Sequence, residues 1–151
     1  LHLSLRRQRQ MCIRDRGSVS LTHLLDTNIC IYIINRHPPQ VAERFAEYPA
    51  DAIGLSSITL AELRYGVSKS GSAKNATVLE AFIEPLEVLP FGTEATLRYG
   101  LLRAKLERLG KPIGAMDLLI AAHALSLGAI LVTNNMGEFE RVEGLKLANW
   151  F

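Results

Sequence analysis

The sequence predicts an α/β domain of three layers, in which a central parallel sheet of about four or five strands is flanked by helices. Three observations lead to this fold class. Short apolar runs that do not alternate with polar residues recur along the chain, which is typical of strands buried on both faces. Segments with helical periodicity separate these runs, and such alternation favours a parallel sheet. The length of 151 residues suits one domain with its own core.

The chain from residue 20 onward begins with an apolar run over residues 21–25, which predicts a buried strand ending at Asp26. Thr27 or Asn28 can cap the helix expected over residues 29–35. That helix ends before a pair of prolines, because proline cannot continue the hydrogen bonding of a helix interior.

The next three elements are a helix, a strand and a helix. Apolar side chains at helical spacing predict a helix over residues 40–48, and the run over residues 51–57 predicts the second strand. Thr59 then opens a helix over residues 59–65, which ends at Gly66 or in the glycine- and serine-rich segment one turn later.

The second half of the chain repeats the alternation of helices and strands. Its longest helical pattern, a regular series of apolar residues, is followed by a glycine and then a proline that end the helix. The later helix is apolar on nearly every side and is therefore expected to be buried. The helices are expected over residues 73–83, 93–109 and 116–127, and the strands over residues 86–91, 129–132 and 145–148.

The positive charge of the chain lies almost entirely at its beginning. The whole sequence has a net charge of +2, whereas residues 21–151 hold 12 basic and 14 acidic residues and so carry a net charge of −2. We expect residues 1–19 to be a basic leader that is non-native or disordered, and residues 20–151 to form the single domain. A basic arm that contacts RNA is the alternative for this leader.

Composition limits the setting of the protein. Two cysteines make no disulfide framework, and the most apolar uncharged run, over residues 118–132, is shorter than the roughly 18 to 20 residues of a membrane span. We therefore expect a cytoplasmic protein with free thiols and no membrane contact. No strand is followed by a glycine-rich phosphate loop, so the sequence offers no nucleotide-cofactor motif.

Two of the three aspartates of the domain, Asp26 and Asp117, lie in strongly apolar surroundings. An ionised carboxylate placed there needs compensation, because its desolvation is costly. A cation between two carboxylates provides that compensation, and oxygen ligands suit Mg²⁺ or Mn²⁺. Asp26 can also act as a helix cap, and Asp117 can be an acid favoured by the helix dipole.

Glu62 is the third candidate acid, with two interpretations. Thr59 and Glu62 fit a capping box, in which Glu62 serves only the start of the helix. Its place after the second strand also puts it at the sheet edge where Asp26 ends the first strand, and ligands bind at that edge in open α/β sheets.

Polar residues follow a later strand as well. Thr133 and Asn134 can orient a ligand or the substrate from this edge, or they can form an ordinary turn, and Glu138 follows shortly after. His123, two turns into a buried helix, is expected to be a core histidine with a hydrogen-bond partner, and Cys30 is expected to pack in the core.

Four segments of the sequence together resemble a PIN domain of the VapC family, the toxins of bacterial type II toxin–antitoxin systems. The match runs from about residue 22 to the C-terminus, in the segments LLDTNICIYI, SSITLAELRYG, GKPIGAMDLLIAAHA and ILVTNNMGEFERVEGL. The resemblance implies a PIN-like nuclease domain, a Mg²⁺-dependent endoribonuclease with Mn²⁺ as a substitute. Its implied partners are an RNA substrate, plausibly tRNA, a VapB-like antitoxin, and a second copy of itself. Cleavage would arrest translation and growth.

The resemblance also implies which residues act. The catalytic acids of the family fall on Asp26, Glu62 and Asp117, with the metal held by Asp26 and Asp117. Many PIN domains have a fourth aspartate where this chain has Asn134, a departure that weakens one metal position and leaves Glu138 as its substitute.

RNA that approaches acidic residues also needs basic side chains nearby. The candidates, which can equally be a solvated helix surface, are Arg64, Arg98, Arg103, Lys105, Arg108 and Lys111. Two other functions stay open. One is a degenerate PIN domain that binds RNA or a partner without catalysis. The other is a receiver-like or ligand-binding module, which lacks here the adjacent acids and late lysine of phosphoacceptor domains.

Overall fold

The computed structural model describes residues 21–151. The leader expected over residues 1–19 lies outside the described residues. None of the helices in the described part of the chain is long and apolar enough to cross a membrane.

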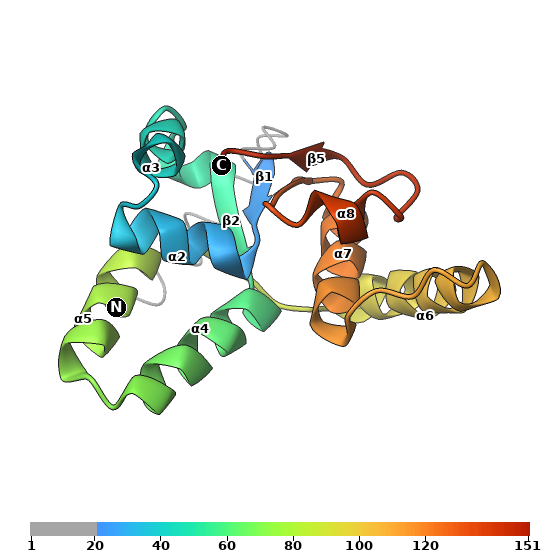
Figure 1. Ribbon diagram of the computed structural model, residues 1–151, viewed down its shortest axis with the longest axis horizontal. Helices are drawn as coiled ribbons and strands as arrows, with labels where there is room; N and C mark the ends of the chain where they lie inside the picture. The colour runs from blue at the N-terminus through green and yellow to red at the C-terminus, as the bar shows by residue number, and fades with distance from the viewer. Residues whose placement is uncertain (1–20) are drawn as a thin grey trace.

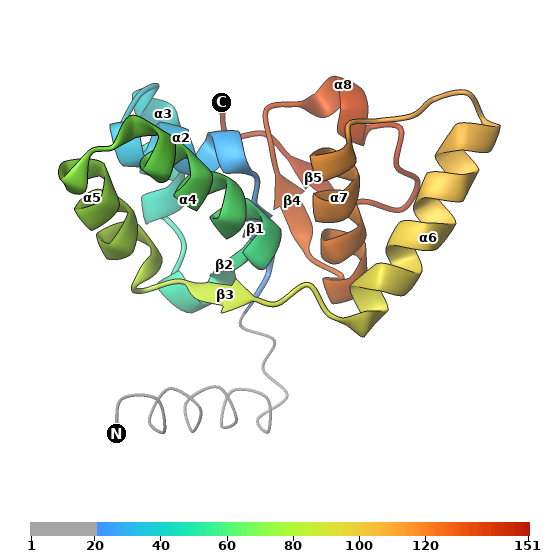
Figure 2. The same ribbon diagram turned by 90° about the horizontal axis from the view of Figure 1, so that it is seen from below.

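A five-stranded sheet forms the centre of the molecule, and all its strands are parallel. The strands follow the order β3-β2-β1-β4-β5, so β1 is central and the chain crosses over to its other side before β4 (Figure 2). This confirms the predicted fold class. The strands are β1 (His23–Leu25), β2 (Ile53–Ser56), β3 (Glu87–Leu89), β4 (Ile130–Val132) and β5 (Leu147–Ala148).

Helices cover both faces of this sheet. In Figures 1 and 2 the group α2 to α5 lies on one side, and α6 and α7 lie on the other. The helices are α2 (Thr27–Asn35), α3 (Pro39–Ala46), the 3₁₀ turn η1 (Ala50–Ala52), α4 (Ser57–Ser70), α5 (Ala73–Ile83), α6 (Thr93–Arg108), α7 (Ala115–Leu127) and the short α8 (Met136–Phe139), which the sequence analysis did not predict.

Two hydrophobic cores result, one on each face of the sheet. Successive residues of β1 point to opposite faces, so Leu24 packs with α6 and α7 while Leu25 packs with α2 and α4. Leu131 and Val132 of β4 divide in the same way. All four side chains are fully buried, which explains why the strand sequences do not alternate between apolar and polar residues.

The start of α4 differs from the prediction. The helix begins at Ser57, and Ser56 caps it by accepting a hydrogen bond from the amide of Ile58 at 3.1 Å. The predicted capping box of Thr59 and Glu62 is therefore wrong, because Thr59 lies inside the first turn and is fully buried. Of the two expected helix ends, Gly66 is too early, and the glycine- and serine-rich segment one turn later is confirmed. The left-handed C-cap residue is Gly71, with φ of 65°.

The structure confirms the expectation for His123. This side chain is 1% exposed, and its Nδ1 lies 2.7 Å from the hydroxyl oxygen of Ser56, the residue that caps α4. Burial lowers the pKa of His123, so the ring is neutral at physiological pH. Cys30 is fully buried in the core on the α2 side, as expected.

Candidate active site

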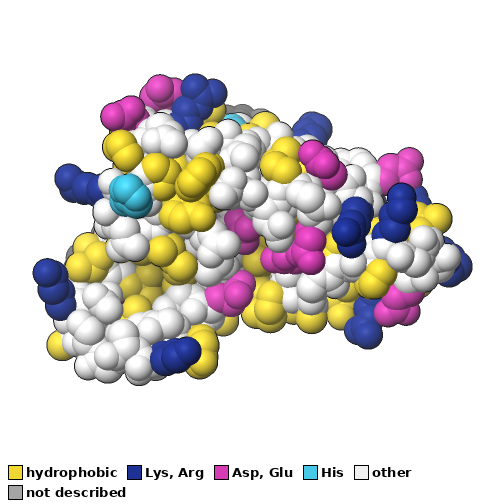
Figure 3. All heavy atoms as spheres, in the orientation of Figure 1, with side chains coloured by type: hydrophobic (Ala, Val, Ile, Leu, Met, Phe, Trp, Pro, Cys, Tyr) yellow, Lys and Arg dark blue, Asp and Glu magenta, His cyan; other side chains and the backbone are white. Residues whose placement is uncertain are grey.

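The three predicted acids lie at the carboxyl edge of the sheet, next to the crossover between β1 and β4. Asp26 follows β1 directly, Glu62 lies in the second turn of α4 after β2, and Asp117 lies in the first turn of α7. Figure 3 shows acidic side chains gathered at the centre of this face, over the junction of the α4 and α7 regions. Ligands of open parallel sheets bind at such an edge.

Asp26 is held in a fixed orientation and is almost completely buried. Its Oδ1 accepts a hydrogen bond of 2.7 Å from the amide of Thr27, which confirms Asp26 as a helix cap and excludes Thr27 and Asn28 as the N-cap of α2. Its Oδ2 accepts one of 2.8 Å from the hydroxyl of Thr133. Burial raises the pKa of Asp26, and these two hydrogen bonds partly oppose that rise.

Glu62 is positioned by α2 and has no part in capping its own helix. Its Oε1 accepts a hydrogen bond of 2.8 Å from the hydroxyl of Thr27. Thr27 therefore links the first two acids, because its amide binds Asp26 while its hydroxyl binds Glu62. The sequence predicts for Thr27 only a possible helix cap. Its contact with Glu62, 35 positions away, depends on how α2 packs against α4 and has no sequence signal.

Asp117 and Glu138 form a second pair, with an asparagine between them. The side-chain amide of Asn135 donates to Asp117 Oδ2 at 3.1 Å and to Glu138 Oε2 at 3.0 Å. Burial raises the pKa of Asp117 to about 7, and a hydrogen bond with Glu138 and the charges of Asp26, Glu138 and Glu62 act in the same direction. The same hydrogen bond lowers the pKa of Glu138. The opposite shifts of the two pKa values favour the proton on Asp117 and the charge on Glu138.

The two asparagines after β4 have different surroundings. Asn134 accepts a hydrogen bond from Asn149, on the segment after β5, at 3.3 Å. The side chain of Asn135 contacts the acids, and the backbone N–H of the same residue donates to the hydroxyl of Thr133 at 2.9 Å. Thr133 and Glu138 thus lie at the edge where the sequence placed them, and the asparagine that contacts the acids is Asn135, not Asn134. An Asn-Asn pair gives no sequence signal for choosing between its members, because the turn decides which side chain faces the acids.

Half of the predicted basic side chains are paired with glutamates. Arg64 binds Glu80 at 2.5 Å, Arg103 binds Glu107 at 3.0 Å, and Lys105 binds Glu143. Within residues 21–151, the side chains of Arg98, Arg108 and Lys111 form no ion pair. The four acids of the site also lack an ion pair with any described lysine or arginine.

The donor chemistry of the site fits a hard divalent cation. Asp26, Glu62, Asp117 and Glu138 offer only carboxylate oxygens, and burial, together with the neighbouring negative charges, raises the pKa of Asp117. As they stand, no three His, Cys, Asp or Glu side chains in the described range are grouped tightly enough to hold a metal ion. A cation bound among these acids would offset the burial and the negative charges that disfavour the ionised form of Asp117.

The raised pKa of Asp117 predicts a pH dependence of stability. The folded chain holds a proton that the unfolded chain releases near the ordinary value of 3.8, so the free energy of unfolding should fall as pH rises from about 4 to about 7. Asp117→Asn should remove this fall, and its stability advantage over the wild type should grow with pH. Chemical unfolding in a metal chelator across this range measures the effect. A difference between the two proteins that stays constant with pH would contradict it.

Comparisons with known proteins agree on one family. The PIN domain family model matches residues 23–145. Ribonuclease VapC2 of Rickettsia felis is 46% identical over 132 residues, which cover 86% of this chain and 98% of that protein. The tRNA(fMet)-specific endonuclease VapC of Salmonella typhimurium is 45% identical over 131 residues, with the same coverage of 86% and 98%.

A solved structure gives the same result for the fold. The crystal structure of DNA-bound VapBC from Salmonella typhimurium matches with a TM-score of 0.80 and 44% sequence identity, covering 87% of this chain and 99% of that chain.

Proposed function

Since the chain belongs to the VapC family of PIN-domain ribonucleases, the toxins of type II toxin–antitoxin systems, we propose that it is a Mg²⁺-dependent endoribonuclease that cuts cellular RNA and so arrests translation and growth. One observation carries the proposal. Four carboxylates, those of Asp26, Glu62, Asp117 and Glu138, come from four separate segments to one edge of the sheet and interact there, and no described lysine or arginine forms an ion pair with any of them.

The proposed substrate is tRNA. Relatives from Salmonella typhimurium and Shigella flexneri, each 45% identical to this chain, are named tRNA(fMet)-specific endonucleases. Other relatives of similar identity are named only ribonucleases. We therefore propose tRNA as the class of substrate and no particular tRNA.

In the proposed mechanism, Asp26 and Asp117 hold the metal ion, for which Mn²⁺ can substitute. A divalent cation bound there supplies a water of lowered pKa and neutralises charge on the scissile phosphate. Asp26 is suited to this role because Thr27 and Thr133 fix both of its oxygens. Asp117 must lose its proton to bind a cation, so metal binding should weaken below about pH 7.

Glu62 acts as the general base in this proposal. The hydroxyl of Thr27 holds Oε1 of Glu62, and Oε2 has no hydrogen-bond partner among the described residues, so it can accept a proton from the attacking water. Asn135 keeps Asp117 and Glu138 at a fixed separation and donates to both. Glu138 also accepts a long hydrogen bond from the amide of Gly114, at 3.4 Å, which ties α8 to the start of α7.

The proposed protein partners are a VapB-like antitoxin and a second copy of the chain. The support for the antitoxin is that solved structures similar to this chain are VapBC assemblies, among them VapBC2 from Rickettsia felis bound to a DNA fragment, with a TM-score of 0.78 and 45% identity. The homodimer follows from family resemblance alone.

Cleavage of tRNA by the purified full chain tests the proposal. Total tRNA should give discrete fragments with Mg²⁺ or Mn²⁺ and remain intact in a metal chelator, as gel electrophoresis would show. Intact tRNA that nevertheless binds the protein would favour the degenerate PIN domain, which acts without catalysis.

A further inference from the structure

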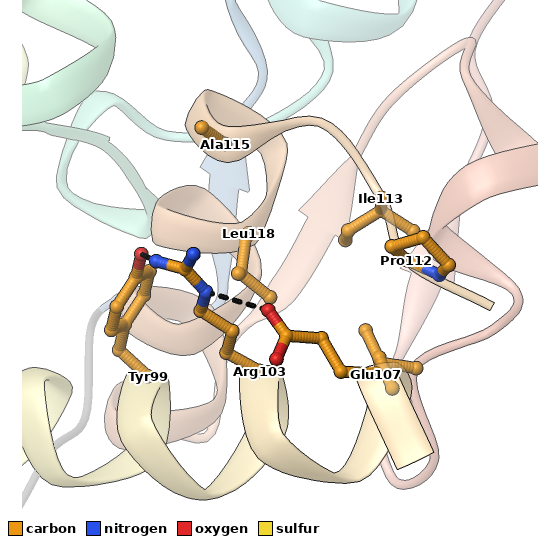
Figure 4. Close-up of a pocket in the computed structure, with 8 residues that line it drawn as sticks. Tyr99, Arg103, Glu107, Pro112, Ile113, Ala115 and Leu118 are labelled. Atoms are coloured by element: carbon orange, nitrogen blue, oxygen red, sulfur yellow. Dashed lines mark hydrogen bonds and ion pairs between the residues drawn. The ribbon is translucent and has the colours of Figure 1, made fainter. Parts of the chain in front are cut away.

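A pocket of about 220 Å³ lies between α6 and the start of α7 (Figure 4). Its apolar walls come from Leu106, Pro112, Ile113 and Leu118. This volume is smaller than the roughly 300–1,000 Å³ of clefts that take drug-sized molecules. The pocket therefore suits a single flat ring system with apolar faces better than a whole nucleotide.

The pocket is continuous with the acidic site through three consecutive residues. Ile113 and Ala115 line the pocket, and Gly114 between them donates its amide hydrogen bond to Glu138. Asp117 follows Ala115 within the first turn of α7. A group bound in the pocket would therefore lie beside a phosphate bound at the carboxylates.

Three polar side chains from successive turns of α6 form the remaining wall. Figure 4 shows them pointing toward one another, with Arg103 in the middle. Arg103 donates from Nη1 to the hydroxyl of Tyr99 at 3.0 Å and from Nε to Oε1 of Glu107 at 3.0 Å. Nη2 of Arg103 and Oε2 of Glu107 have no hydrogen-bond partner among the described residues, so a donor and an acceptor remain side by side at the pocket.

The charges of this wall exclude a phosphate as the occupant. Arg103 and Glu107 neutralise each other, and a phosphate placed against Arg103 would also face the Glu107 carboxylate. A neutral ligand that needs both an acceptor and a donor fits better. The Watson–Crick edge of guanine has this pattern, because N1–H and the 2-amino group donate while O6 accepts.

We propose that this pocket binds one guanine base of the RNA substrate, with Glu107 accepting from N1–H and the 2-amino group and Arg103 donating to O6. The base would pack between apolar walls, as unstacked bases do in proteins that read single-stranded RNA. The inference rests on the proposed action on RNA and adds to it a sequence preference for guanosine near the scissile phosphate.

Binding measurements without cleavage test this pocket separately from the nuclease. The full chain is titrated in a metal chelator with fluorescent pentaribonucleotides of the form UUXUU, with each of the four bases at X. Guanine should bind about tenfold to a hundredfold more tightly than the other bases, the range expected for one good two-point contact to a base edge. Inosine at X, which lacks the 2-amino group, should lose part of this preference without any change in the protein.

Variants of the ion pair identify the contact. Glu107→Gln should remove most of the guanine preference, whereas Glu47→Gln should retain it. Glu47 is a matched control, since it also forms an exposed helical ion pair, with a side chain 61% exposed against 59% for Glu107. Melting temperatures of both variants should stay near that of the wild type, because exposed ion pairs contribute little to stability.

Four results would overturn the guanine pocket. Three of them are equal affinity for the four bases, no measurable binding of any pentanucleotide, and a guanine preference that survives Glu107→Gln. The fourth is an Arg103→Ala variant that weakens all four pentanucleotides equally, because Arg103 would then be a phosphate contact. Cleavage of tRNA remains the independent measure of the proposed nuclease, so failure of the pocket and failure of the nuclease are distinguishable.

Discussion

Asp117→Asn is expected to abolish RNA cleavage while leaving the protein at least as stable as the wild type. The substitution keeps the size of the side chain and removes the charge that the proposed cation requires. Loss of a group that only supports a metal ligand typically lowers activity or metal affinity about 10- to 100-fold. Loss of a ligand should cost more, so we expect turnover to fall more than about 100-fold, and an expressed variant should no longer arrest growth.

Stability should respond in the opposite direction. The pKa of Asp117 is raised to about 7 by burial and by the neighbouring carboxylates, so above that pH the wild type holds an unfavourable charge that the variant lacks. Denaturant unfolding in a chelator at about pH 8 measures this difference. Asp51→Asn serves as the matched control, because Asp51 is exposed in the turn η1, away from the acidic site.

Two outcomes would contradict this assignment. One is an Asp117→Asn protein that cuts RNA at the wild-type rate with Mg²⁺. The other is loss of cleavage together with loss of folding, which would make Asp117 a structural residue. The Asp51→Asn control should show wild-type values in both measurements.

Glu62→Gln is expected to lower cleavage about 10²- to 10⁴-fold, the usual range for loss of a general base. The glutamine oxygen can still accept the hydrogen bond from Thr27, which in the wild type is 2.8 Å long, so the contact between α2 and α4 should survive. The free energy of unfolding should stay the same or rise, because one of several repelling carboxylates becomes neutral.

The decisive measurement is a pair of values for Glu62→Gln, namely turnover on RNA at saturating Mg²⁺ and the free energy of unfolding without metal. Glu94→Gln is the matched control, since Glu94 is exposed at the start of α6. Near-normal turnover would reduce Glu62 to a partner of Thr27 and leave the site with two aspartates. The structure has already removed the other explanation for Glu62, because Ser56 and not a capping box begins α4.

Much of the fold was predictable because it depends on apolar pattern alone. Fully buried residues such as Leu24 and Leu25 need no partner of special shape, and their continuous apolar run specifies a strand covered on both faces. The location of Asp26 and Asp117 at the sheet edge follows from the same pattern, since both directly border apolar segments that had to be buried.

Local hydrogen bonds decided the details that the sequence left open. Ser56, Ser57 and Thr59 all precede or begin a helix and can all cap one, and the end of β2 selected Ser56. Asn134 and Asn135 are chemically identical neighbours, and only the turn after β4 directs Asn135 toward Asp117 and Glu138.

The electrostatic environment of the site belongs entirely to the tertiary structure. Whether a lysine or arginine is available to RNA depends on its partner, and Lys105 pairs with Glu143, a residue 38 positions away. The raised pKa of Asp117 likewise results from its burial in the folded chain and from carboxylates of three other segments. The sequence by itself therefore determined the layers, the strands and the edge at which the acids meet, because these features depend on which residues of each segment are apolar and must be buried. Only the folded structure decided which polar atoms pair there, because hydrogen bonds and charges act over distances that packing alone sets.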